Sequence, residues 1–178
     1  MPKIDLDAIP RLVALLAELD ALLLDEGTEW FQASNLEITE IEVGNRATNV
    51  IPASARARIS IRFNDLHSGA ALGERIAAIA ARHGGTARPV VSGESYLTPP
   101  GELSDIVAAA IEAETGVVTE LSTSGGTSDA RFLKDLCPVI DFGPPNATMH
   151  KRDEAVALDD LETLVRIYRR IALAALRT

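Results

Sequence analysis

The chain has 178 residues and is poor in cysteine, in positive charge and in long apolar runs. Its one cysteine, Cys137, excludes an internal disulfide and indicates a reducing compartment. A net charge of -9 argues against nucleic acid as the main partner, because phosphate binding needs a basic face. The longest apolar run, residues 12–24, carries two acids and is too short for a membrane span, and no leader is visible at the N-terminus. We therefore expect a cytoplasmic protein with neither a membrane nor a nucleic-acid partner.

Histidine is also scarce, with three in the chain and no HxD, HExxH or CxxC pair. A zinc site needs three or four protein ligands, so the residues alone predict no complete zinc motif. His150 follows a glycine-proline turn in "GPPNATMHKRDE" and can be either a metal ligand or a plain loop histidine. His67 and His83 fall in a probable turn and at a helix end, and we interpret both as surface residues.

The apolar spacing that is present predicts alternating helices and strands. Helices are expected at 8–26, 69–83, 102–115, 127–135 and 158–176, and strands at 35–43, 55–63, 87–93, 117–121 and 138–142. The alternation of the first strand slips near Glu40, as it does at a β-bulge. The stretch "LTPPG" interrupts the pattern and predicts two domains, at residues 1–98 and 99–178.

The last predicted helix should bury one apolar stripe against its neighbours. Its members recur at helical spacing and are Leu161, Leu164, Val165, Tyr168 and Ile171.

Two polar segments can carry chemistry. The turn "SGGTSD" at 124–129 can bind a carboxylate through backbone N–H groups, or can simply cap a helix. On the polar face of strand 55–63, Arg62 can clamp a carboxylate or stabilise an oxyanion. For Arg56 and Arg58 we prefer a solvated sheet face. Asn49, in "TNVIP", offers an amide donor.

Four segments occur in an order that makes the chain recognisable: "GNRATNVIPASARARISIRFN", "SGESYLTPPG", "STSGGTSDARFLKD" and "GPPNATMHKRDEAV". Together they resemble the succinyl-diaminopimelate desuccinylases of the zinc aminoacylase and carboxypeptidase superfamily, over about residues 9–176. The motifs "GGTSDARF" and "NATMHK" separate this branch from the acetylornithine deacetylases. The resemblance implies an α/β (α+β) fold: a lid-type sandwich with an antiparallel sheet and two helices, lacking its first strand, and then part of an αβα catalytic domain.

The resemblance also implies roles for single residues of the second half. His150 matches the family's last zinc ligand, and Asn146 matches a substrate-binding asparagine. Gly126 and Thr127 match a turn that holds the substrate's backbone or carboxylate. In the family, Asn49 and Arg62 match lid residues that reach across a homodimer to bind substrate and the tetrahedral oxyanion.

The chain departs from the family pattern because the upstream His-x-Asp pair, the Glu-Glu pair with the general base and a further acidic ligand are absent. We interpret the chain as the lid and the C-terminal part of a zinc amidohydrolase that converts N-succinyl-LL-2,6-diaminopimelate to succinate and diaminopimelate in lysine biosynthesis. Alone it should bind zinc weakly or not at all, and it should be inactive.

A non-catalytic dimerisation or binding module and a deacylase such as acetylornithine deacetylase remain as alternatives. Either way we expect a homo-oligomer, because strands 55–63 and 87–93 would lack a neighbour and unpaired strand edges recruit other strands.

Overall fold

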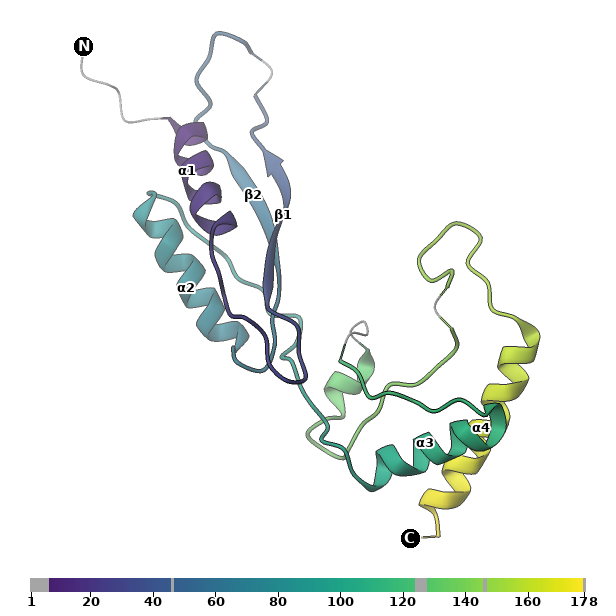
Figure 1. Cartoon of the computed structure of the whole chain (residues 1–178). Helices are drawn as coiled ribbons and strands as arrows, with labels where there is room; N and C mark the ends of the chain where they lie inside the picture. Colours follow the sequence, from purple (N-terminus) through teal and green to yellow (C-terminus); the bar gives the residue numbers. More distant parts are fainter. Residues whose placement is uncertain (1–6, 46, 124–127, 146, 178) are drawn as a thin grey trace. The chain divides into compact units, whose positions relative to one another are not determined.

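The computed structural model of the chain describes residues 7–45, 47–123, 128–145 and 147–177. It divides into a first unit that ends at Tyr96 and a second unit that begins at Leu97. None of the described helices is long and apolar enough to cross a membrane. The elements are α1 (Ala8–Asp20), β1 (Asn35–Glu42), β2 (Arg56–Arg62), α2 (Gly69–Arg82), α3 (Glu102–Thr115), a 3-10 turn (Asp129–Phe132) and α4 (Leu158–Ala175), as Figure 1 shows.

In the first unit, β1 and β2 form an antiparallel hairpin whose register runs from Asn35 opposite Arg62 to Glu42 opposite Arg56. The register shifts between Ile38 and Glu40, which confirms the predicted bulge. Residues of β2 alternate between half-buried and exposed, as expected when one face of a sheet is covered and the other meets solvent.

Helices α1 and α2 cover the apolar face of this hairpin (Figure 1), as predicted for a lid-type sandwich. Four side chains are buried between the layers, and the apolar residues of both strands pack against them. Burying each such side chain contributes about 1.5–3 kcal/mol. The four are Leu16, Leu19, Ile76 and Ile79.

The segment after α2 does not form the strand predicted at 87–93. It runs back along α2, where a Cβ on Gly73 would lie 3.0 Å from the Pro89 side chain. The Glu94 carboxylate accepts a hydrogen bond from the amide of Gly69 at 3.0 Å and so caps the start of α2. The prediction was wrong because a strand needs a hydrogen-bonded neighbour, and among the described residues only β1 and β2 pair.

Helix α1 is also shorter than predicted, because it ends at Asp20 rather than at residue 26. The chain leaves the helix before Asp25 and turns inward, so that the Asp25 carboxylate accepts the amides of Gly27 and Ser34. These two bonds need a non-helical turn, and Gly27 adopts a φ of 90° within it.

The second unit is built on the pair of α3 and α4. Its buried apolar residues are Ala110, Ile111 and Ile167, with Phe142 packed against them. Within the described residues the strands predicted at 117–121 and 138–142 are not formed, and in place of the helix expected at 127–135 there is a 3-10 turn at Asp129–Phe132. Short apolar runs cannot become strands without a sheet to join.

Helix α4 buries only part of the predicted stripe: Ile171 packs against the core and Leu164 is half-buried, whereas other members are exposed. Ile167 is 2% exposed, whereas Leu161, Val165 and Tyr168 are 41%, 68% and 48% exposed. Because these three follow one another at intervals of four and three residues, they form a second stripe on the helix. We call Leu161, Val165 and Tyr168 the outer stripe of α4; all three are exposed, although the ring of Tyr168 lies 5.7 Å from that of Phe142.

Candidate functional site

The two candidate residues of the first unit lie at opposite ends of its hairpin. Arg62 is the last residue of β2, and Asn49 belongs to the loop that joins β1 to β2 in Figure 1. Both residues are exposed. The six residue steps from Arg56 to Arg62 alone span roughly 20 Å. One hairpin therefore does not bring Asn49 and Arg62 to the same point.

Arg62 differs from the other two arginines on the polar face of the sheet. Arg56 lies opposite Glu42 and Arg58 lies opposite Glu40 in the ladder. Arg58 forms an ion pair with Glu40, in which Nη1 and Oε2 are 2.8 Å apart, and both side chains are well exposed.

The ladder partner of Arg62 is the neutral Asn35, and no described residue pairs with its guanidinium group. A free guanidinium is the arginine state that can accept a carboxylate or an oxyanion.

A buried polar cluster lies at the Arg62 end of the hairpin. The carboxylate of Asp25, whose side chain is 7% exposed, accepts bonds from Nδ2 of Asn64 at 2.7 Å and from Nε2 of His67 at 2.9 Å. It also accepts the amides of Gly27 at 2.7 Å and Ser34 at 3.2 Å. The amide of Asn64 in turn donates to Oγ of Ser34 at 3.0 Å. We call Asp25, Ser34, Asn64 and His67 the Asp25 cluster.

These bonds set the charge of Asp25. Burial raises the pKa of its carboxyl, but hydrogen bonds from the Ser34 hydroxyl, the Gly27 and Ser34 amides and the Asn64 side chain lower that pKa by more. The resulting pKa lies far below the ordinary aspartate value of 3.8, so Asp25 is an anion at neutral pH. Because an ionised carboxylate only accepts hydrogen bonds, His67 donates its Nε2 proton to it.

In the second unit, His150 lies exposed on a loop that is closed by its own hydrogen bonds. Oγ1 of Thr148 donates to the carbonyl of Ala155 at 2.7 Å and accepts the Ala155 amide at 3.1 Å. The His150 amide donates to Oε2 of Glu154 at 3.3 Å, and His150 has a φ of 59°. A left-handed backbone is uncommon for histidine and concentrates at functional sites.

The residues around His150 do not by themselves fit a zinc ion. Nowhere in the described ranges do three His, Cys, Asp or Glu side chains gather in a way that could hold a metal. Of the other candidates, Gly126, Thr127 and Asn146 lie outside the described residues. Just after that turn, Oγ of Ser128 accepts the Ala130 amide at 3.0 Å and caps the 3-10 turn.

Two residues of interest were not found from the sequence. Asp25 belongs to no motif, and its partners are 2 to 42 residues away, so only the fold reveals it. The sequence places Arg131 within the helix predicted at 127–135 and gives it no role of its own. Its Nε is buried without a hydrogen-bond partner in the described part of the chain, and its guanidinium carbon lies 4.7 Å from the centre of the Phe132 ring. A buried unpaired donor costs about 1–3 kcal/mol.

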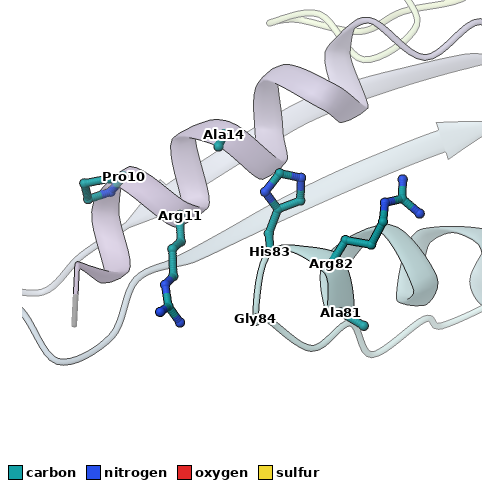
Figure 2. A pocket seen from close by; sticks show the side chains of 7 residues that line it. All are labelled: Pro10, Arg11, Ala14, Ala81, Arg82, His83 and Gly84. Carbon is teal, nitrogen blue, oxygen red and sulfur yellow. The ribbon is translucent and has the colours of Figure 1, made fainter. Parts of the chain in front are cut away.

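A shallow groove in the first unit contains none of the candidate residues. Figure 2 shows it between the start of α1 and the end of α2, with the ring of His83 turned toward α1. Its charged groups are engaged: Glu18 binds Nε2 of His83 at 2.7 Å and also pairs with Arg82. These bonds lower the pKa of Glu18.

Comparison with known proteins shows which family the chain resembles. The family model of the peptidase dimerisation domain matches residues 1–88. The chain is 68% identical over 175 residues to the succinyl-diaminopimelate desuccinylase of Novosphingobium aromaticivorans, covering 98% of this chain and 47% of that protein. The chain belongs to the succinyl-diaminopimelate desuccinylase family.

Two further desuccinylases agree with this assignment. The Erythrobacter litoralis protein is 65% identical over 98% of this chain and 46% of its own length. The Sphingopyxis alaskensis protein is 61% identical over 97% of this chain and 46% of its own length. The chain thus spans about half the length of the curated desuccinylases it matches. The match covers both units, and the roles of single residues stay predictions.

Proposed function

We propose that this chain contributes a lid and part of the catalytic domain to a zinc-dependent amide hydrolase. The substrate is N-succinyl-LL-2,6-diaminopimelate and the products are succinate and diaminopimelate, in lysine biosynthesis. The observation that carries the proposal is the match at 68% identity over 98% of the chain to a protein named for this activity.

In this proposal the first unit makes a homodimer and supplies donors to the substrate. The peptidase dimerisation domain match at residues 1–88 supports the dimer. So does the two-stranded sheet, since each strand keeps one edge that no described residue pairs. Arg62 donates to the oxyanion or a substrate carboxylate, and Asn49 donates through its amide. Because these two residues lie at opposite ends of the hairpin, they contact different parts of the bound substrate or different active sites.

In the second unit, Gly126, Thr127 and Asn146 hold the substrate, and Arg131 adds a donor whose buried Nε has no acceptor among the described residues. His150 is one zinc ligand. Because the described residues gather no further ligands, the rest of the zinc site and the general base come from outside this chain, and we derive no catalytic step through the metal.

A chimera tests the proposal. The chain replaces its matching 175 residues in the Novosphingobium desuccinylase, and succinate release is measured with and without a zinc chelator. We expect chelator-sensitive hydrolysis, and we expect Arg62→Ala to lower kcat/KM on the order of a hundredfold if it removes an oxyanion donor. Arg58→Ala, on the same sheet face, is the matched control and should change little. A folded chimera without activity would overturn the proposal.

The second candidate is a non-catalytic dimerisation or binding module. It is favoured by the dimerisation domain match and by the lack of a metal-holding group among the described residues. Sedimentation equilibrium of the pure chain tests assembly separately from catalysis. A mass that stays near 19 kDa at all concentrations contradicts a dimer, whether catalytic or not. A dimeric chain whose chimera folds without hydrolysing the amide would favour this module.

A further inference from the structure

Arg62 occupies the last pair of a two-stranded ladder, which is a weak place for a residue that must be held in position. The ends of such ladders open locally at little cost in free energy. A displacement of about 1 Å in an active site can cost on the order of a hundredfold in rate. Some other contact must therefore hold the Arg62 end of the hairpin.

The Asp25 cluster supplies that contact. Ser34 directly precedes Asn35, and Asn64 follows Arg62 by two residues, so the two flank the last ladder pair. Oδ1 of Asp25 accepts both the Ser34 amide at 3.2 Å and Nδ2 of Asn64 at 2.7 Å. One carboxylate oxygen thus joins the chain just before β1 to the chain just after β2.

The same carboxylate also fixes the connection from β2 to α2. Its Oδ2 accepts Nε2 of His67 at 2.9 Å, and the turn is closed by the Leu66 amide bonding to Oδ1 of Asn64 at 3.1 Å. The loop after α1, which carries Asp25, passes this end of the hairpin in Figure 1.

We propose that Asp25 is a positioning residue for Arg62, because its carboxylate clamps the two strand ends that flank the Asn35–Arg62 pair. The proposal rests on the proposed function in one respect only, namely that Arg62 contacts the substrate. Asp25 itself does not touch the substrate. It needs to be a carboxylate because its donors include the amides of Gly27 and Ser34, Asn64 Nδ2 and His67 Nε2. An amide side chain offers one acceptor oxygen and two unwanted donors.

The same unit contains a matched control. Glu18 also pairs with a histidine, with its Oε2 at 2.7 Å from Nε2 of His83, but its bonds to His83 and Arg82 join α1 to the end of α2. If every acid–histidine pair were needed to stabilise this unit, substitutions at Asp25 and at Glu18 would have the same effect. The clamp predicts an effect on the strand ends at Asp25 alone.

The first experiment is amide hydrogen exchange on the full chain. We expect Asp25→Asn to accelerate exchange at the Asn35–Arg62 end at least tenfold and to leave the Glu42–Arg56 end within about twofold. Glu18→Gln should change neither end. Ser34→Ala, a milder variant that removes the hydroxyl bound by the Asn64 amide, should give a smaller acceleration at the same end. Equal acceleration at both ends, or none, would overturn the clamp.

The second experiment is a double-mutant cycle in the chimera described above. Asp25→Asn should lower kcat/KM in the parent, and it should have almost no further effect once Arg62→Ala is present. A residue with only a structural role would lower kcat/KM by the same factor in both backgrounds, which would refute positioning. If the parent chimera folds without activity, the proposed function fails, while hydrogen exchange still decides whether the clamp exists.

Discussion

The two units solve the problem of burying apolar surface to different extents. In the first unit, four buried aliphatic side chains lie between two helices and a sheet face. The buried carboxylate of Asp25 accepts hydrogen bonds from the loops of that unit. In the second unit, Ala110, Ile111 and Ile167 are the buried apolar residues, and the outer stripe of α4 faces solvent. Ion pairs also join the helix pair of the second unit, because Glu114 of α3 binds both Arg166 and Arg170 of α4.

The match to the family extends over both units, but only the first unit encloses an apolar core between two layers. A two-layer sandwich closes its own core, whereas a helix pair with an uncovered apolar face depends on further protein to cover it.

The largest effect is expected from separating the units. Residues 1–96 alone should unfold cooperatively, because they contain the whole four-residue core. Residues 97–178 alone should show no cooperative transition and should bind a hydrophobic dye. Circular dichroism during heating measures the unfolding of both pieces. A sharp transition in residues 97–178 would contradict the expected difference between the two units.

In the intact chain, truncating a buried side chain should cost more free energy of unfolding than truncating an exposed one. Ile76→Ala should reduce the free energy of unfolding of the first unit by about 2–5 kcal/mol, since it empties a buried site. Denaturant unfolding can be followed by the single tryptophan, Trp30, which lies in that unit. Val165→Ala in the outer stripe should stay within about 0.5 kcal/mol. Equal losses in the two variants would contradict the burial difference.

Acid should weaken the first unit through Asp25. Because the folded state lowers the pKa of Asp25 below its ordinary 3.8, the unfolded chain takes up its proton first as the pH falls. The stabilisation is fully present well above pH 3.8 and is lost progressively below it. Trp30 fluorescence in denaturant titrations between about pH 6 and 3 measures this slope. Asp25→Asn should flatten it, and the remainder should come from groups such as Glu18, whose pKa is also lowered.

The smallest effect is expected at Glu114. Glu114→Gln removes the charge that binds Arg166 and Arg170, but both arginines are more than half exposed, so water replaces much of the interaction. The helical signal of the second unit should fall slightly, and the unfolding of the first unit should not change. A shift in the Trp30 transition would show that the units are coupled.

The spacing of apolar residues along the chain predicted the hairpin and the helices, which depend mainly on that spacing. Alternation in β2 and the slip near Glu40 gave the hairpin, its covered face and its bulge. Helical spacing gave α2, α3 and α4 to within about two residues. The strands at 87–93, 117–121 and 138–142 were wrong, because an apolar run indicates that residues favour burial and does not reveal whether a neighbouring strand exists.

The stripe predicted for α4 is confirmed at Ile171, which packs against the core, and is wrong at its exposed members. Leu161, Val165 and Tyr168 have the spacing of a buried stripe, but α3 packs against the face that contains Ile167. Among candidate site residues, Arg62 and His150 could be proposed from sequence because they belong to recognisable segments. The Asp25 cluster could not, because its members are brought together by the tertiary fold.

The bulge in β1 makes the chain tolerant of a change in length. Thr39 has no partner in the ladder, since Ile38 faces Ile59 and Glu40 faces Arg58, and its hydroxyl donates to the Arg58 carbonyl at 3.2 Å. Deleting Thr39 would leave every existing pair in place and restore simple alternation, with Ile38 still facing the helices and Glu40 still facing solvent. Deleting Glu37 instead would exchange the two faces of the strand ahead of the bulge. Natural variation by one residue should therefore be accepted at Thr39 and rejected two positions earlier.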